Sequence, residues 1–266
     1  MSTGRDTRLD AAWDALERGD WPEVEAFLKR RKPKQSGERL LLEAHWLLAH
    51  GDLAGAATRC ERARMELGDA HPDGLWTAGE VALYRWEVSA AAGHYAALDA
   101  IEPSAPLSLR RSLCADLRGD NEQAVAHIQR ARELDPESCG ELPRWSVEPF
   151  EAAVDEAARA LPVEFSRALD ALPVVLDPVP ERELARGREA ETPPDLLGLY
   201  VGPTALERST EAPDPFPVAI YLFQRNLERA CADGDMLVEQ VRVTLWHELG
   251  HALGFEEDGL DAIGLG

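Results

Sequence analysis

The chain has 266 residues, enough for one large domain or two ordinary ones, and its 45% hydrophobic and 29% charged content is typical of a globular protein. A formal net charge of −21 disfavours binding to nucleic acid or to anionic membranes, because both reward a basic surface. The amino-terminal MSTGRDTRLD lacks the apolar stretch of a secretion signal, and no run approaches the roughly 18 apolar residues that span a bilayer.

The four cysteines are scattered singly along the chain. They therefore match neither the spacing of a zinc knuckle nor a dense disulfide framework. We expect reduced, structural cysteines and a cytoplasmic protein.

A sequence pattern recurs in the first half of the chain: a glycine, a polar residue and then an amphipathic helix. Its glycines are Gly19, Gly51, Gly93 and Gly119, which makes the repeat irregular, with spacings of 32, 42 and 26 residues. Each copy of the pattern predicts two helices joined by a tight turn. A single hairpin of this kind cannot bury both of its apolar faces, whereas stacked hairpins can. We predict a helical-hairpin solenoid.

Two copies of this pattern resemble the tetratricopeptide repeat. The fourth has the family's relative spacings at Gly119, Asp120, Ala124, Ala131 and Pro136, and the second has them at Gly51, Asp52, Ala56 and Ala63. The resemblance implies a concave surface that binds a peptide or another protein. The alternative is a structural repeat whose groove is filled by the neighbouring domain.

The charge balance changes after about residue 140. Residues 1–144 carry 25 acidic and 19 basic side chains, whereas residues 145–266 carry 24 acidic and only 9 basic ones. This shift supports a boundary, and we predict two domains, residues 1–140 and residues 145–266.

The second domain begins with helices and continues with strands. Residues 149–172 predict one amphipathic helix and then a second, short helix that has Pro162 in its first turn. Three short segments rich in Val, Ile, Leu and Tyr, each bounded by Pro or Gly, predict a small sheet. They are residues 173–177, 196–202 and 217–223.

The final predicted helix carries the sequence HELGH. Asp235 is its expected N-cap, and Gly254 suits the left-handed residue that ends many helices. His247 and His251 lie one turn apart on one face, so both imidazoles can point at one metal ion, and Glu248 can reach a water on that metal. Zinc lowers the pKa of such a water towards ~7 and polarises a substrate carbonyl, while Glu248 would act as general base and acid.

A third ligand is expected from the tail or from upstream. Glu257 stands six residues after His251, which gives HExxHxxGxxE, the metzincin spacing with a carboxylate in place of the third histidine. Asp258 and Asp261 are close competitors. The tail after Glu257 has no methionine for the Met-turn of true metzincins, which indicates a smaller relative.

Residues 150–264 resemble the minimal zincin-like metallopeptidases of bacteria, which are built around HExxHxxGxxD. The segments that carry the resemblance are FEAAVDEAARALPVEF, LLGLY, PVAIYLFQRNL and VRVTLWHELGHALGFEEDGLDAIG. The resemblance implies a compact α+β fold, one zinc ion bound by His247, His251 and the residue at position 257, and Glu248 as the catalytic carboxylate. Glu257 departs from the family's usual Asp.

In folds of this family an edge strand beside the active-site helix commonly pairs with an extended peptide substrate. The segment PVAIYLF is the candidate for that strand. Tyr200 and Tyr221 are candidate donors to an oxyanion, although a packed sheet tyrosine is the commoner case.

The predicted protein is thus multidomain, an all-α tetratricopeptide-like helical-hairpin solenoid followed by a small α+β zincin-like domain. Its predicted function is zinc-dependent hydrolysis of peptide bonds, with a peptide or protein substrate and a protein partner or substrate on the helical repeats. The alternatives are a non-catalytic protein-binding scaffold with a structural or degenerate metal site, and a metal-dependent hydrolase acting on other substrates. Two histidines and a carboxylate also suit iron or manganese.

Overall fold

The computed structural model describes residues 7–30, 36–185, 192–203 and 217–255. The chain divides by its internal packing into two compact units. The first contains Met1–Pro103 and Ala185–Pro193, and the second contains Ser104–Leu184 and Pro194–Gly266. These units are defined by contacts within the chain, whereas the predicted domains, residues 1–140 and 145–266, were defined by fold type. The predicted domain boundaries therefore stay a prediction.

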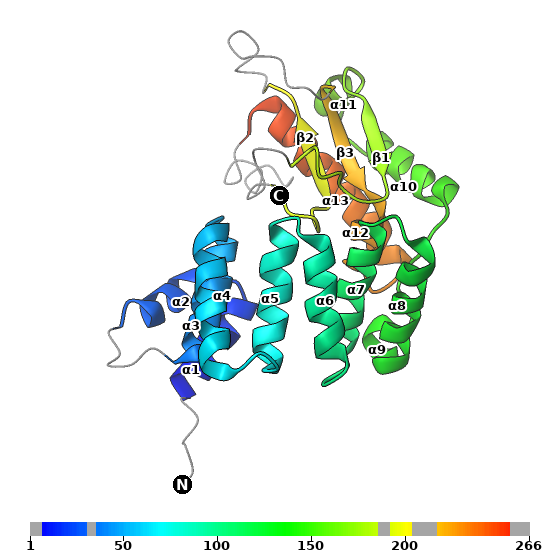
Figure 1. Cartoon of the computed structure of the whole chain (residues 1–266). Coiled ribbons are helices and arrows are strands. Elements are labelled where there is room, and N and C mark those ends of the chain that lie inside the picture. Colours follow the sequence, from blue (N-terminus) through cyan, green and yellow to red (C-terminus); the bar gives the residue numbers. More distant parts are fainter. Residues whose placement is uncertain (1–6, 31–35, 186–191, 204–216, 256–266) are drawn as a thin grey trace. The chain divides into compact units, whose positions relative to one another are not determined.

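The first unit is built from helical hairpins (Figure 1). Its helices are α1 (Thr7–Glu17), α2 (Trp21–Leu28), α3 (Gly37–Ala49), α4 (Leu53–Leu67), α5 (Pro72–Tyr84) and α6 (Val88–Asp99). Small buried side chains let the helices approach closely: Ala44 of α3 packs with Ala56 and Cys60 of α4 and with Ala78 of α5. Alternation of small and large residues at such contacts gives the dense packing of a protein interior.

One turn geometry recurs in the helical hairpins that the structure describes. The residue at the turn is left-handed, with φ of 70° at Gly19, 75° at Gly51, 59° at Trp86 and 73° at Gly119. In each turn its N–H donates to the carbonyl three residues earlier, and the next N–H donates to the carbonyl five residues earlier, as for Gly51 to Leu48. This is the Schellman pattern, which satisfies the last carbonyls of a helix.

The third turn therefore lies at Trp86, and its prediction at Gly93 was wrong. Gly93 lies inside α6. The left-handed conformation costs a non-glycine residue about 1–2 kcal/mol, and burial of the indole offsets this cost. Trp86 is buried, and its Nε1–H donates to the carbonyl oxygen of Thr192 at 3.1 Å. With Trp86 in place the turns are 32, 35 and 33 residues apart, which is a regular repeat.

The second unit contains the fourth hairpin and the sheet. Its helices are α7 (Ala105–Asp116), α8 (Asn121–Leu134), α9 (Pro136–Cys139), α10 (Val147–Arg159), α11 (Val163–Leu169), α12 (Gln224–Arg229) and α13 (Gly234–Leu253). Its strands are β1 (Val174–Asp177), β2 (Gly198–Val201) and β3 (Ala219–Phe223). The three predicted strands are confirmed, and so is a short helix that follows Pro162. These observations agree with a helical part followed by a small α+β part.

The strand order is β1-β3-β2, with β3 parallel to β1 and antiparallel to β2. The segment PVAIYLF, which contains β3, is thus the central strand, and its prediction as an edge strand was wrong. All five residues of β3 are buried, as expected of a strand covered on both faces and paired on both sides. The edge strand of this sheet that contacts α13 is β2.

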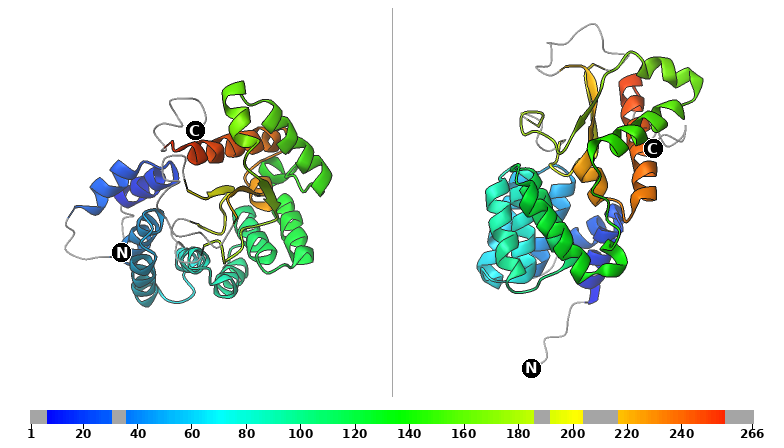
Figure 2. Two further views of the ribbon diagram at one scale, coloured as in Figure 1. Left: turned by 90° about the horizontal axis from the view of Figure 1, so that it is seen from above. Right: turned by 90° about the vertical axis from the view of Figure 1, so that its right-hand side faces the viewer.

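The two faces of the sheet pack against different partners. Ile220 and Leu222 of β3 join a core made with α10 and α13, and the right-hand view of Figure 2 shows these helices on one side of the sheet. Tyr221 and Phe223 point to the opposite face, where they pack with Leu184. Side chains alternate along a strand, so one strand supplies both cores.

Buried charges attach the fourth hairpin to α12. Asp116 at the end of α7 pairs with Arg229, and with Arg144 at 2.8 Å, and its side chain is only 5% exposed. Glu228 accepts hydrogen bonds from the backbone N–H of Trp145 and from Arg225, both at 2.8 Å. Burial alone would raise the pKa of the Asp116 carboxyl, but the hydrogen bonds and charges of the two arginines outweigh it and hold that pKa below its ordinary value.

None of the helices in the described part of the chain has the length and apolar character needed to cross a bilayer. All four cysteines are buried, and none is in a disulfide.

Candidate metal centre

The helix that carries HELGH is α13. Its N-cap is Asp233, whose Oδ1 accepts the N–H of Met236 at 2.8 Å, so the prediction of Asp235 was two residues late. Asp235 instead lies in the first turn, where its negative charge interacts favourably with the helix dipole and stabilises the helix. The sequence does not distinguish the two positions, because Asp233 and Asp235 are both favourable N-cap residues.

One face of α13 is fixed in the core. Leu237, Val241, Leu245 and Leu249 are fully buried there, as the predicted apolar stripe requires. In addition, Nε1–H of Trp246 donates to the carbonyl oxygen of Ala157 in α10 at 3.1 Å. The helix is therefore held on both sides of the turn that carries the histidines.

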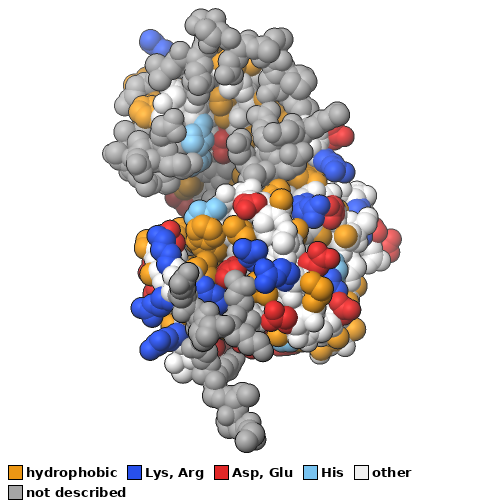
Figure 3. All heavy atoms as spheres, turned by 60° about the vertical axis from the view of Figure 1, so that its left-hand side comes forward, with side chains coloured by type: hydrophobic (Ala, Val, Ile, Leu, Met, Phe, Trp, Pro, Cys, Tyr) orange, Lys and Arg blue, Asp and Glu red, His pale blue; other side chains and the backbone are white. Residues whose placement is uncertain are grey.

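The two histidines of α13 converge. Nε2 of His247 lies 3.0 Å from Nε2 of His251, and the rings meet edge to face with centroids 4.6 Å apart. Both side chains are partly exposed, so an ion could reach them. Figure 3 shows that some histidine side chains of the protein reach its surface.

The tautomer of His251 follows from its second nitrogen. Nδ1 lies 3.2 Å from the carbonyl oxygen of Phe255, and because a carbonyl only accepts, Nδ1 must carry the proton. In the neutral tautomer with the proton on Nδ1, Nε2 is the nitrogen that can bind a metal, and it is the one that faces His247. A backbone carbonyl on the distal ring nitrogen is the contact that usually orients a metal-binding histidine.

The end of α13 places that carbonyl. Gly254 is left-handed, with φ 91°, as predicted. Its N–H donates to the carbonyl of His251 at 2.9 Å, and the N–H of Phe255 donates to that of Gly250 at 3.1 Å, which closes a fifth Schellman turn. The chain reverses there, and the carbonyl of Phe255 comes to lie beside the His251 ring.

Glu248 is buried between α13 and β2, at 8% exposure. Its Oε2 accepts the backbone N–H of Tyr200 at 2.7 Å. At Gly198 a Cβ atom would lie 2.6 Å from Cγ2 of Thr244 and 3.1 Å from Cγ of Glu248. The strand therefore lies directly on the turn that carries Glu248, a contact that sequence reasoning missed because it involves a backbone N–H and an absent side chain.

The two tyrosines differ in their position. The hydroxyl of Tyr200 donates to the carbonyl of Pro203 at 2.8 Å, and its ring packs on the α13 side of the sheet. Tyr221 is buried on the opposite face, stacked with Phe223. Tyr221 therefore belongs to the core rather than to the site.

The predicted third ligand and its competitors lie outside the described residues. Glu257, Asp258 and Asp261 all fall within residues 256–266, which the structure does not describe. Among the residues that it does describe, no group of three or more His, Cys, Asp or Glu side chains is arranged to hold a metal. The predicted site residues that the structure describes are thus His247, Glu248 and His251.

The histidine pair fits zinc. Nitrogen ligands lie about 2.0–2.1 Å from tetrahedral zinc, which sets two of them about 3.3 Å apart. The observed separation of the two Nε2 atoms is 3.0 Å. The two nitrogens are thus within a few tenths of an ångström of the separation that a shared zinc ion requires, and in the structure the same contact is a hydrogen bond between the two rings.

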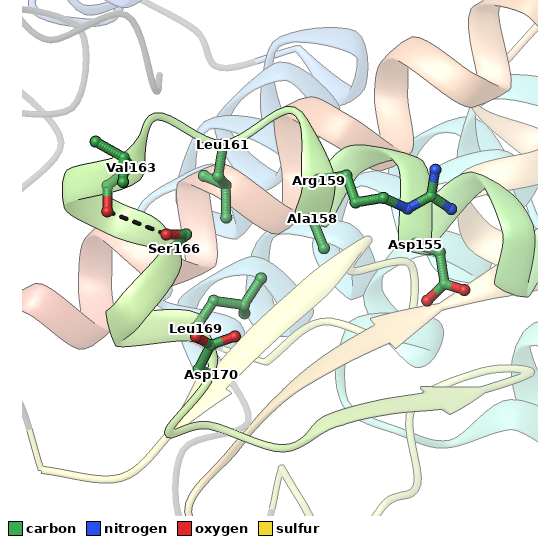
Figure 4. A pocket seen from close by; sticks show the side chains of 8 residues that line it. All are labelled: Asp155, Ala158, Arg159, Leu161, Val163, Ser166, Leu169 and Asp170. Carbon is green, nitrogen blue, oxygen red and sulfur yellow. Dashed lines mark hydrogen bonds between the residues drawn. The ribbon is translucent and has the colours of Figure 1, made fainter.

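A groove of about 560 Å³ lies elsewhere in the second unit, between the end of α10 and α11 (Figure 4). Leu161 and Leu169 form its apolar wall, and Asp155, Arg159 and Asp170 add charges. No predicted site residue lines it, so the groove and the histidine pair are separate features.

Comparison with known families agrees with the geometry. Residues 169–266 match the family model of the zincin-like metallopeptidases. The match includes the whole sheet, α12 and α13, and with them all the predicted site residues. This supports the zincin part of the sequence-based interpretation and the general expectation of zinc binding. The helices before residue 169 lie outside the match, so their tetratricopeptide nature stays a prediction. No match was found among curated proteins.

Proposed function

We propose that this chain is a zinc-dependent peptidase in which His247, His251 and Glu257 bind one zinc ion and Glu248 is the catalytic carboxylate. The observation that carries the proposal is the approach of the two Nε2 atoms to 3.0 Å beside a buried glutamate. It occurs within a segment that matches a zincin-like metallopeptidase family. When bound, zinc polarises a carbonyl and makes water more acidic.

Glu248 would move the proton. A carboxylate next to the ion takes the proton of the attacking water and later delivers it to the leaving amine. Its burial removes competing solvent, and the hydrogen bond from Tyr200 restricts its orientation. His251 would be kept in the correct tautomer by the carbonyl of Phe255.

The proposed substrate is an extended peptide that adds to β2. The N–H of Phe223 donates to the carbonyl of Leu197 at 2.9 Å, which marks a hydrogen-bonded pair of the antiparallel ladder. Two residues further on, Leu199 also directs its backbone groups at β3, so those of Gly198 and Tyr200 point away from β3. The N–H of Tyr200 is taken by Glu248, so the groups offered to a peptide are those of Gly198 and the carbonyl of Tyr200. Peptides commonly bind by adding a strand to such an edge.

The helical repeats would select a protein substrate or partner. Four turns of one geometry at 32 to 35 residue intervals support a tetratricopeptide-like array. We also place the protein in the cytoplasm, where thiols stay reduced, in keeping with four free cysteines.

Metal content measured by elemental mass spectrometry tests the site. We expect about one zinc per chain in the wild type and in Asp258→Ala, and loss of zinc in His251→Ala and Glu257→Ala. A chain that cannot be loaded with zinc would refute the proposal. Loss in Asp258→Ala alone would move the third ligand to Asp258.

A peptide-library digest tests the reaction. Wild type should cleave, and Glu248→Gln should keep its zinc and lose cleavage by a factor of at least about 10². Zinc binding without cleavage by the wild type would instead favour the non-catalytic scaffold. Cleavage that is equal in both proteins would indicate a contaminating peptidase.

A further inference from the structure

We propose that the outer edge of β2 positions the catalytic carboxylate: the backbone N–H of Tyr200 holds Glu248, and Gly198 is the residue whose lack of a side chain permits this contact. The role assigned to Glu248 rests on the proposed function. The contact itself is a property of the fold and can be measured without metal or substrate.

The hydrogen bond has the features of a strong one. The Tyr200 nitrogen lies 2.7 Å from Oε2 of Glu248, a length typical of charge-assisted bonds. Glu248 is 8% exposed, so little water competes for it. In the ladder with β3 the N–H of Tyr200 points outward, which makes α13 rather than the sheet its partner.

Space is the reason for glycine at position 198. Gly198 is not among the left-handed residues, so its conformation does not demand glycine. A Cβ atom would lie 2.6 Å from Cγ2 of Thr244, 3.1 Å from Cγ of Glu248 and 3.2 Å from the carbonyl oxygen of Tyr221. Any side chain would therefore push β2 away from α13 and lengthen the bond to Tyr200.

The bond constrains the reacting group. With Oε2 held by a donor fixed in the sheet, the carboxylate cannot rotate freely about its last bond, and its other oxygen keeps a constant direction. Preorganisation of this kind lowers the barrier of a reaction rather than strengthening substrate binding. Tyr200 thus acts through its backbone, as a positioning residue, and the identity of its side chain does not enter the contact.

The contact can be tested by NMR on the full-length chain without metal. The protein has four tyrosines, so labelling with ¹⁵N-tyrosine gives four backbone amide signals, and Tyr200→Phe identifies one of them. We expect the Tyr200 amide proton to move upfield and to exchange with solvent at least about tenfold faster in Glu248→Ala. The amide of Tyr221, which faces β2 within the ladder, is the internal control.

Two variants sharpen this measurement. Glu248→Gln keeps an oxygen acceptor, so it should give an intermediate shift. Thr244→Ser changes the neighbouring turn without touching the acceptor, and it should leave the Tyr200 signal in place. A Tyr200 amide that is unchanged in Glu248→Ala would overturn the proposal, even if the chain proves to be an active peptidase.

The consequence for catalysis is tested at Gly198. Gly198→Ala should lower kcat at least about tenfold and leave the zinc content within about twofold, because the ion does not need this contact. KM should rise by a smaller factor than kcat falls, because the displaced strand is also the one to which the peptide is proposed to add. Thr244→Ser removes the methyl group that a Cβ would strike, so the double variant should recover part of kcat. Gly93→Ala, in open space on α6, is the matched control.

An unchanged kcat in Gly198→Ala would overturn the positioning role. An equal loss in Gly198→Ala and in the double variant would also overturn it, because the steric argument would then be wrong. If the wild type cleaves no peptide, the proposed function fails, and the NMR result still decides the contact.

Discussion

The buried pair of Asp116 and Arg229 offers the sharpest test of the fold. The two side chains are 5% and 9% exposed, and they join α7 to α12. Removing one partner of such a pair leaves a buried charge without its counterion, which typically costs 3–5 kcal/mol. Arg229 keeps a hydrogen bond to Asn226 at 2.6 Å, so we expect the lower end, about 3 kcal/mol, for Asp116→Asn.

Thermal unfolding followed by circular dichroism measures this effect. For a chain of this size 1 kcal/mol corresponds to about 2–4 °C, so Asp116→Asn should lower Tm by about 6–12 °C. The matched control is Glu239→Gln, which breaks an exposed pair with Arg242 on α13 and should cost less than about 1 kcal/mol. Equal losses in the two variants would refute the reasoning.

The contribution of Asp116 to stability should also depend on pH in a defined direction. The pKa of Asp116 is lower in the folded protein than in the unfolded chain, so its contribution to stability is present above the unfolded pKa. This contribution is lost as the pH falls through the lower, folded value. The difference in stability between wild type and Asp116→Asn should therefore be constant near neutrality and shrink only in acid. A difference that vanished between pH 6 and pH 8 would contradict this assignment.

Three further results are expected. Gly254→Ala must place a side chain at φ 91°, at a cost of about 1–2 kcal/mol, and should weaken zinc binding in a metal titration because the carbonyl that orients His251 moves. Trp86→Gly relieves the left-handed strain but removes a buried indole, so urea unfolding should show a net loss of about 2 kcal/mol or more, and a gain in stability would contradict our account of the third turn. Burial raises the pKa of Cys60 and Cys231 to about 11, so both thiols should resist alkylation at pH 8 until urea unfolds the chain.

Local sequence patterns predicted the helices and strands. The features that the sequence patterns missed depend on contacts between residues far apart in the chain. The strands, the position of α13 and its end at Gly254 follow from hydrophobic periodicity and from residue types that act on their neighbours. The turn at Trp86 is different, because its left-handed conformation depends on a partner 106 residues away. Glycine is the usual signal for such a turn, and so the repeat was placed at Gly93.

The site shows the same division. The spacing of His247 and His251 is a property of one helix, and the structure brings their ring nitrogens together as the pattern requires. The contact of Glu248 with β2 depends on how the sheet is ordered, and here the apolar run PVAIYLF misled the prediction. A continuous apolar strand is covered on both faces, which is typical of a central strand rather than an edge.

The charges that join α7 to α12 also limit how this chain could have changed in length. A hairpin gained or lost before Ser104 would leave Asp116, Arg144 and Arg229 in place, whereas one inserted between α7 and α12 would separate partners that cannot be left buried alone. Hairpins added or lost on the amino-terminal side of α7 would therefore leave this cluster of charges intact. A truncated protein intended for expression should accordingly begin before α7, not at the residue where the family match begins.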